Sequence, residues 1–126
     1  MNRENADRAH PFRMDRRFSL GRNKIFQQVY RRGVSHPGRL VVLVYQKARE
    51  QKVGFSVSAK VGCSVTRNRV RRMLREDFRM ERPSLKPGKY IFIARSHSSH
   101  AGHEALTRDM RSVLKRAGLY VVEDEA

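Results

Sequence analysis

The sequence is poor in cysteine, poor in acidic residues and without a long apolar run. Its single cysteine, Cys63, excludes an internal disulfide and fits a reducing compartment. No stretch is apolar enough to span a bilayer, and the charged start MNRENADRAH lacks the apolar run of a signal peptide. We therefore expect a cytoplasmic protein with no membrane-spanning segment.

The shortage of acidic residues leaves a large excess of positive charge. The 126 residues carry 28 Lys and Arg against 12 Asp and Glu, which gives a net charge of +16 and a pI of about 11.3. Such a chain repels itself and favours a polyanionic partner, most often a nucleic acid, with an anionic membrane surface as the alternative. The length is enough for one domain with one modest core.

Arginine is concentrated in residues 60–82, KVGCSVTRNRVRRMLREDFRMER, for which the periodicity predicts a helix over 65–82. One arc of this helix is apolar, with Val70, Met73, Leu74 and Phe78. The opposite arc is a basic ridge formed by Asn68, Arg71, Arg72, Arg75, Arg79 and Arg82. Glu76 and Asp77 fall toward the sides, so we expect no acid to neutralise the ridge. Ser64 or Thr66 could cap the helix, and Pro83 would end it.

A solvated charged face is the simpler interpretation of such a ridge. Solvated faces, however, normally mix signs, because like charges four residues apart repel each other. Arginine also favours phosphate, since its planar guanidinium donates two hydrogen bonds to one phosphate group. The pattern therefore indicates a surface that meets an anionic partner.

Two consecutive motifs resemble a known family. FSVSAKVG at 55–62, followed by RNRVRRMLRE at 67–76, is similar to the signature of the bacterial ribonuclease P protein component. The resemblance extends from about Arg17 to Leu119. It implies a protein subunit of ribonuclease P, whose RNA subunit, with bound Mg²⁺, removes the 5′ leader of precursor tRNA. The implied partners are ribonuclease P RNA, in a 1:1 complex, and precursor tRNA, with no membrane involved.

The resemblance also assigns residues to two binding sites and none to catalysis or to a metal in the protein. The implied contacts to the RNA subunit are Arg67, Asn68, Arg69, Arg71, Arg72 and Arg75. A cleft between the first helix and the sheet would hold the single-stranded leader. Its implied lining is Phe26 and Tyr30 from the helix, with Ser56 and Lys60 from the strand side. Core packing is the alternative role for the two aromatic residues.

The sequence departs from the family pattern at two positions of this cleft. The family often has an aromatic residue on the first strand, where this chain has Val44, and Tyr45 would face the other side. The family also commonly has two adjacent lysines before the turn, where this chain has Ala59 and Lys60. We therefore expect a cleft that is less aromatic and less basic than usual.

The remaining periodicity predicts an α/β fold, an α+β sandwich with a mixed central sheet and helices packed on it. The predicted helices are 23–32, with the stripe Ile25, Phe26, Val29 and Tyr30, then 65–82 and 103–117; the predicted strands are 40–46, 53–58 and 90–95. The first two strands are expected to pair as a hairpin, and 53–95 to form a βαβ unit, which the resemblance implies is left-handed. Residues 1–16 are predicted to be a mobile basic arm, 17–119 a single ribonuclease P protein domain, and 120–126 an acidic tail.

Two other functions are compatible with parts of the sequence. A general RNA-binding or ribosome-associated module, without a processing role, would explain the charge equally well. His97, His100 and His103 could bind a metal in a nuclease that acts alone, although solvated loop histidines are the simpler interpretation.

Overall fold

The computed structural model describes residues 23–121, and for residues 23–25 only the backbone. The predicted basic arm at 1–16 and residues 122–126 of the acidic tail therefore lie outside the described part. The helices are α2 (Asn23–Arg32), α3 (Ser64–Glu81) and α4 (His103–Arg116). The strands are β1 (Val34–Pro37), β2 (Val41–Gln46), β3 (Lys52–Ser56) and β4 (Lys89–Ala94). Short 3₁₀ turns are η2 (Ala59–Val61), η3 (Arg82–Ser84) and η4 (Ser96–His100).

The strands form one mixed sheet in the order β1-β2-β4-β3. β2 is antiparallel to both β1 and β4, whereas β3 is parallel to β4. The predicted fold class and the β3–α3–β4 unit are thus confirmed. The predicted hairpin between residues 40–46 and 53–58 is wrong, because β4 lies between these strands. The other neighbour of β2 is β1, a short polar strand that ends at Pro37 and was not predicted.

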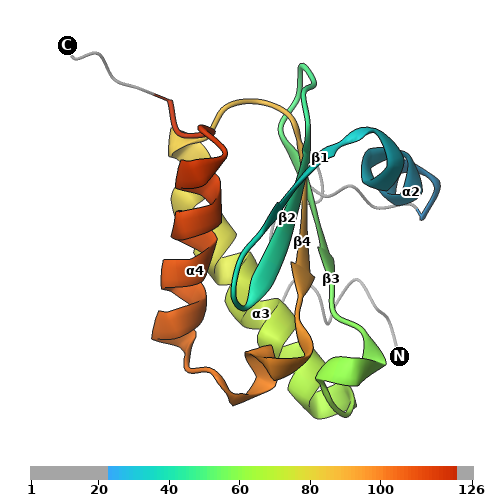
Figure 1. Cartoon of the computed structure of the whole chain (residues 1–126), viewed down its shortest axis with the longest axis vertical. Helices are drawn as coiled ribbons and strands as arrows, with labels where there is room; N and C mark the ends of the chain where they lie inside the picture. Colours follow the sequence, from blue (N-terminus) through green and yellow to red (C-terminus); the bar gives the residue numbers. More distant parts are fainter. Residues whose placement is uncertain (1–22, 122–126) are drawn as a thin grey trace, which may run out of the picture.

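Helices cover both faces of the sheet (Figure 1). On one face, α3 and α4 bury the larger core, in which the rings of Phe78 and Phe92 lie 5.6 Å apart and neither side chain is exposed. On the other face, α2 buries a small cluster of Val29, Val44 and Ile91. The two cores result from the alternation of side chains along β2 and β4, since successive residues point to opposite faces. Because α2 buries only this small cluster, the second face is less covered than the first.

The chain remains attached to the domain beyond Leu119. The Tyr120 hydroxyl donates a hydrogen bond of 2.9 Å to Glu81, and the Val121 N–H donates one of 2.8 Å to the carbonyl of Ser84. Gly118 follows α4 with a φ of 69°, in the left-handed region that favours glycine. Within residues 23–121, no helix combines the length and apolar character needed to cross a bilayer.

Candidate nucleic-acid interface

The helix α3 has the two faces that its sequence predicts. Val70, Leu74 and Phe78 are fully buried, and Met73 packs partly against the same core. The start of the helix differs from the prediction, because Ser64 is already its first residue and the cap position belongs to Cys63, without a side-chain capping hydrogen bond. The Cys63 sulfur lies 3.5 Å from the Thr66 hydroxyl, and this contact, together with nearby backbone N–H groups, lowers the pKa of the exposed thiol.

The basic ridge is partly exposed, since Arg71, Arg75 and Arg82 are half-buried, and its uncompensated charge lies in the N-terminal half of α3. Arg72 is exposed, and Arg71 donates a hydrogen bond of 3.0 Å to the side chain of Asn68. Contrary to the prediction, an acid neutralises one arginine of the ridge, since Glu76 at its flank forms a salt bridge of 3.0 Å with Arg79. Among the described residues, no acid forms a salt bridge with Arg67, Arg69, Arg71 or Arg72.

Two of the predicted contact residues also hold the neighbouring turns. Arg67 donates through Nε to the carbonyl of Gly62 at 3.2 Å, and Arg69 donates through Nη2 to the carbonyl of Ser99 at 3.0 Å. A guanidinium carries five N–H donors, so each side chain keeps donors for another acceptor. These two arginines therefore fix the turn before α3 and the η4 turn beside it, while they border the ridge.

The aromatic residues of α2 divide between packing and exposure. Phe26 packs, partly buried, against the cluster of Val29, Val44 and Ile91. Tyr30 is 44% exposed, and its ring centre lies 6.1 Å from that of Phe26. Core packing therefore explains the position of the Phe26 ring in part, and it does not explain the position of the exposed Tyr30 ring. The rings together form an apolar edge that continues from the small core into solvent.

Of the two predicted strand-side residues, Ser56 lies on the same face of the sheet as these rings. Ser56 of β3 is the register partner of Ile93, which packs partly against the same cluster as Phe26. Lys60 follows in η2 and is exposed. Val44 is buried on this face, whereas Tyr45 lies on the opposite face with its ring 5.0 Å from that of Tyr90, as predicted. The face is thus apolar at its centre and small and polar along β3.

Comparisons with known proteins decide the family. The ribonuclease P family model matches residues 14–118. The chain belongs to this family. A ribonuclease P protein component of Clostridium botulinum, strain Loch Maree, is 43% identical over 105 residues, which cover 80% of this chain and 95% of the relative. One of Bacillus velezensis is 36% identical over 110 residues, covering 85% of this chain and 95% of the relative.

Solved structures agree with this assignment. The RNase P protein of Staphylococcus aureus superposes with a TM-score of 0.77 at 27% identity, covering 82% of this chain and 97% of the other. The RNase P protein of Thermotoga maritima has a TM-score of 0.67 at 24% identity, covering 77% and 93%, and supports the fold. The chain therefore has the family fold over nearly the whole length of these proteins.

In this ribonuclease P protein, the histidines predicted in one loop belong to two elements, His97 and His100 to η4 and His103 to the start of α4. His97 forms a hydrogen bond with the carbonyl of Arg39, whereas His103 forms one of 2.8 Å with Asp77. Within residues 23–121, no group of three or more His, Cys, Asp and Glu side chains is arranged to hold a metal ion.

Asp77 was expected at the side of α3 but is buried between α3 and α4. It accepts hydrogen bonds of 2.8 Å from both His103 and Thr107. Burial raises the pKa of this carboxyl, and the hydrogen bond from Thr107 and the charge of His103 oppose that shift. Asp77 therefore joins the two helices of the larger core and does not contribute to the ridge.

Sequence reasoning missed one cation on the α2 side of the sheet. Arg95 follows Ile93 by two residues in extended backbone, so both side chains are directed to the same face. Its Nε atom is buried without a hydrogen-bond partner among the described residues. The alternation in YIFIAR contains the signal, because it places Ile91, Ile93 and Arg95 on one face and Tyr90, Phe92 and Ala94 on the other.

Proposed function

We propose that this ribonuclease P protein binds the RNA subunit of its holoenzyme through the N-terminal half of α3. The observation that carries the proposal is the group of exposed and half-exposed arginines around Asn68, with which no described acid forms a salt bridge. Guanidinium groups without a carboxylate partner repel one another, and RNA phosphates would relieve that repulsion. Support also comes from the family, whose relatives carry the name of a ribonuclease P component.

We further propose that the α2 side of the sheet binds the single-stranded 5′ leader of precursor tRNA. Unpaired bases would stack on Tyr30 and on the exposed part of Phe26, at about 1–3 kcal/mol for each stacked base. The small side chain of Ser56 would allow the single-stranded leader to approach β3 closely. Lys60 and Arg95 would bind phosphates of the leader. Mature tRNA lacks the leader, so these contacts favour substrate over product.

In this proposal the protein contributes binding and the RNA subunit contributes chemistry. The Mg²⁺ that supports cleavage would be held mainly by RNA, and the protein would lower the charge repulsion around it. The assembly would contain one protein for each RNA, process tRNA transcripts in the cytoplasm and involve no membrane. The residues of the protein would position substrate and RNA without taking part in bond cleavage.

Reconstitution tests the function directly. Purified protein is added to a bacterial ribonuclease P RNA and precursor tRNA at a Mg²⁺ concentration too low for the RNA alone. We expect cleavage at the mature 5′ end, with stimulation that saturates at one protein for each RNA. Binding of both RNAs without stimulation would instead indicate a general RNA-binding module. Cleavage without the RNA subunit would contradict the assignment of chemistry to RNA.

A further inference from the structure

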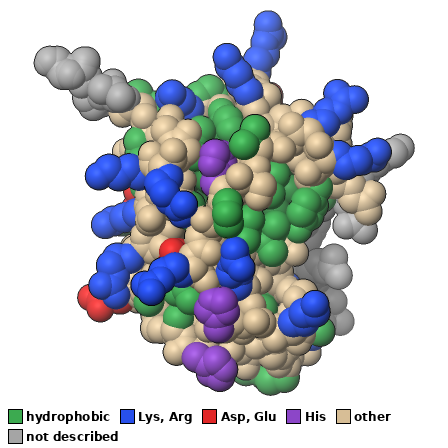
Figure 2. All heavy atoms as spheres, in the orientation of Figure 1, with side chains coloured by type: hydrophobic (Ala, Val, Ile, Leu, Met, Phe, Trp, Pro, Cys, Tyr) green, Lys and Arg blue, Asp and Glu red, His purple; other side chains and the backbone are tan. Residues whose placement is uncertain are grey.

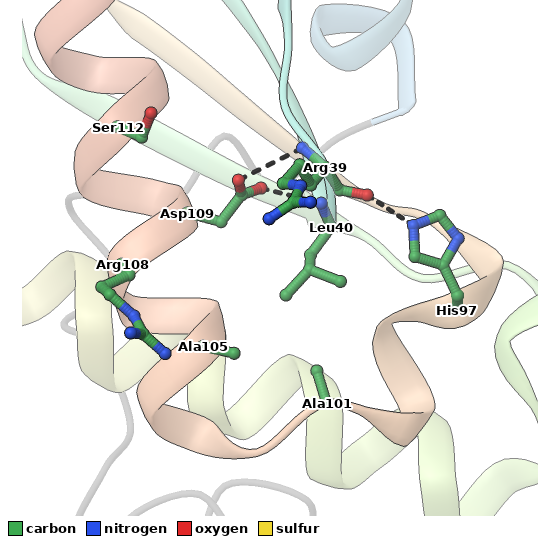
Figure 3. A pocket seen from close by; sticks show the side chains of 8 residues that line it. All are labelled: Arg39, Leu40, His97, Ala101, Ala105, Arg108, Asp109 and Ser112. Carbon is green, nitrogen blue, oxygen red and sulfur yellow. Dashed lines mark hydrogen bonds between the residues drawn. The ribbon is translucent and has the colours of Figure 1, made fainter.

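A pocket of about 800 Å³ lies beside α4, on a part of the molecule that shares no residue with the ridge or the α2 side of the sheet. Its wall is formed by the turn between β1 and β2, by η4 and by one side of α4 (Figure 3). The side chains that line it include Arg39, Leu40, His97, Ala105, Arg108 and Ser112. Ligand pockets in proteins commonly have volumes of roughly 300–1,000 Å³, so this one is large enough for a small organic molecule.

The pocket is held in shape by hydrogen bonds across its wall. The carboxylate of Asp109, on α4, accepts three bonds from backbone N–H groups of the turn: Arg39 at 3.2 Å, Leu40 at 2.8 Å and Val41 at 3.0 Å. The ring of His97 forms a further bond to the carbonyl of Arg39. Because one turn is tied to both α4 and η4, the pocket is formed before any ligand arrives, which reduces the entropy cost of binding.

The chemistry of the pocket combines two cations with an apolar floor. Arg39 and Arg108 are exposed, and neither forms a salt bridge with an acid among residues 23–121. The charge of Asp109 is already stabilised by its three backbone donors, so it leaves both guanidinium groups available. Leu40 and Ala105 supply apolar surface beside them. Figure 2 shows Lys and Arg side chains that project from the α4 side of the molecule, with few acidic side chains among them.

We infer that this pocket binds a nucleoside phosphate. The phosphate lies between Arg39 and Arg108, which can each donate two hydrogen bonds to it. The base lies on the apolar surface of Leu40 and Ala105, and Ser112 offers a hydroxyl to the sugar or base. A free nucleotide and one nucleotide of an RNA strand present the same chemistry to this pocket. The inference is independent of the proposed function, because it concerns other residues.

Titration of the isotope-labelled full-length protein by NMR tests the inference. The probes are 5′-AMP, adenosine, inorganic phosphate and the trinucleotide r(AAA). We expect 5′-AMP to shift the amide signals of residues 39–41 and 105–112, and to bind at least about tenfold more tightly than adenosine or phosphate. A tighter trinucleotide at the same signals identifies an RNA strand as the source, and a tighter mononucleotide identifies a free nucleotide.

Three variants and a matched control separate the pocket from general charge. Arg39→Ala and Arg108→Ala should each weaken 5′-AMP binding about tenfold, since each removes one charged phosphate contact. Ala105→Leu should block binding without a change in charge, because it fills the floor of the pocket. Lys115→Ala removes an exposed charge from the same helix outside the pocket and should change affinity by less than about twofold.

Several results would overturn the inference. Inorganic phosphate that binds as tightly as 5′-AMP would remove any role for the base. Signals that move only on α3 or β3 would place the nucleotide in another site. If the affinity for 5′-AMP falls as much in Lys115→Ala as in Arg108→Ala, net charge and not the pocket accounts for binding.

Discussion

The ridge on α3 is best tested by removing Arg71 and Arg72 together. Both lie in the uncompensated half of the helix, and neither forms a salt bridge with a described acid. If each guanidinium meets one phosphate, Arg71→Ala with Arg72→Ala should weaken binding to ribonuclease P RNA by about 2 kcal/mol, or roughly thirtyfold. The dependence of log affinity on log salt should fall in slope by about 1.4–1.8, since each phosphate contact contributes about 0.7–0.9.

The same change should leave the fold intact. Among the described residues, the change removes one side-chain interaction, the hydrogen bond of 3.0 Å between Arg71 and Asn68, which lie three residues apart on the helix. Such pairs contribute about 0.2–0.5 kcal/mol to a helix. Loss of repulsion between neighbouring arginines offsets part of that cost. The free energy of unfolding, measured by urea titration, should therefore stay within about 0.5 kcal/mol of the unchanged protein.

The assay is fluorescence anisotropy of labelled ribonuclease P RNA over a range of about 0.05–0.2 M salt. The control is Lys86→Ala with Lys115→Ala, which removes the same charge from two exposed positions outside α3. This control should lose less than about 0.5 kcal/mol of binding free energy, through long-range attraction alone. Equal losses in the two double variants would refute the ridge as a contact surface. A collapse of the circular dichroism signal would show instead that the arginines are structural.

Three further predictions concern the α2 face, the β1–β2 turn and the buried carboxyl. Tyr30→Ala should weaken binding of precursor tRNA to the holoenzyme by about 1–3 kcal/mol and leave mature tRNA nearly unaffected; equal losses would argue against leader stacking. Gly38→Ala should lower the free energy of unfolding, measured by urea titration, by about 2–3 kcal/mol, because a Cβ at this position would lie 2.6 Å from Val113 Cγ1. Gly102→Ala is the control. A Cβ there has no atom within 4 Å, so this change should cost less than about 1 kcal/mol. Asp77 has a raised pKa in the folded state, so the folded protein holds this proton more tightly than the unfolded chain. The stability of the unchanged protein relative to Asp77→Asn should therefore fall as pH rises above about 4, and parallel curves of unfolding free energy against pH would contradict this.

The helices could be predicted because each carries its own amphipathic pattern. Leu106, Met110, Val113 and Leu114 of α4 are all fully buried, as their spacing predicts. This signal is local, since the apolar residues of one turn predict the position of the next. The strand pairing could not be predicted in the same way, because it joins residues distant in sequence. The polar VSHP of β1 gives no alternating pattern, yet it pairs with β2 at the edge of the sheet, and Arg116 of α4 donates a hydrogen bond of 2.8 Å to the carbonyl of Pro37.

The candidate sites show the same division. The direction of the arginines on α3 follows from the helical period, so the side of the helix on which they lie was predictable from the sequence. Their local partners were less so: Glu76 reaches Arg79 from the flank of the ridge because three residues bring the two onto one side of the helix. The link from Arg69 to Ser99, 30 residues away, could not be read from period at all.

The pocket beside α4 shows why tertiary structure adds candidates that no motif contains. Arg39 belongs to a turn and Arg108 to a helix 69 residues later, and neither stands in a basic run comparable to that of α3. They line the same pocket because Asp109, next to Arg108, accepts hydrogen bonds from the backbone of the turn that contains Arg39. Asp109, which stabilises the turn, thus also positions Arg39 and Arg108 beside the same pocket. Asp109→Ala should therefore disrupt the turn and the nucleotide pocket together, whereas Arg108→Ala should affect the pocket alone.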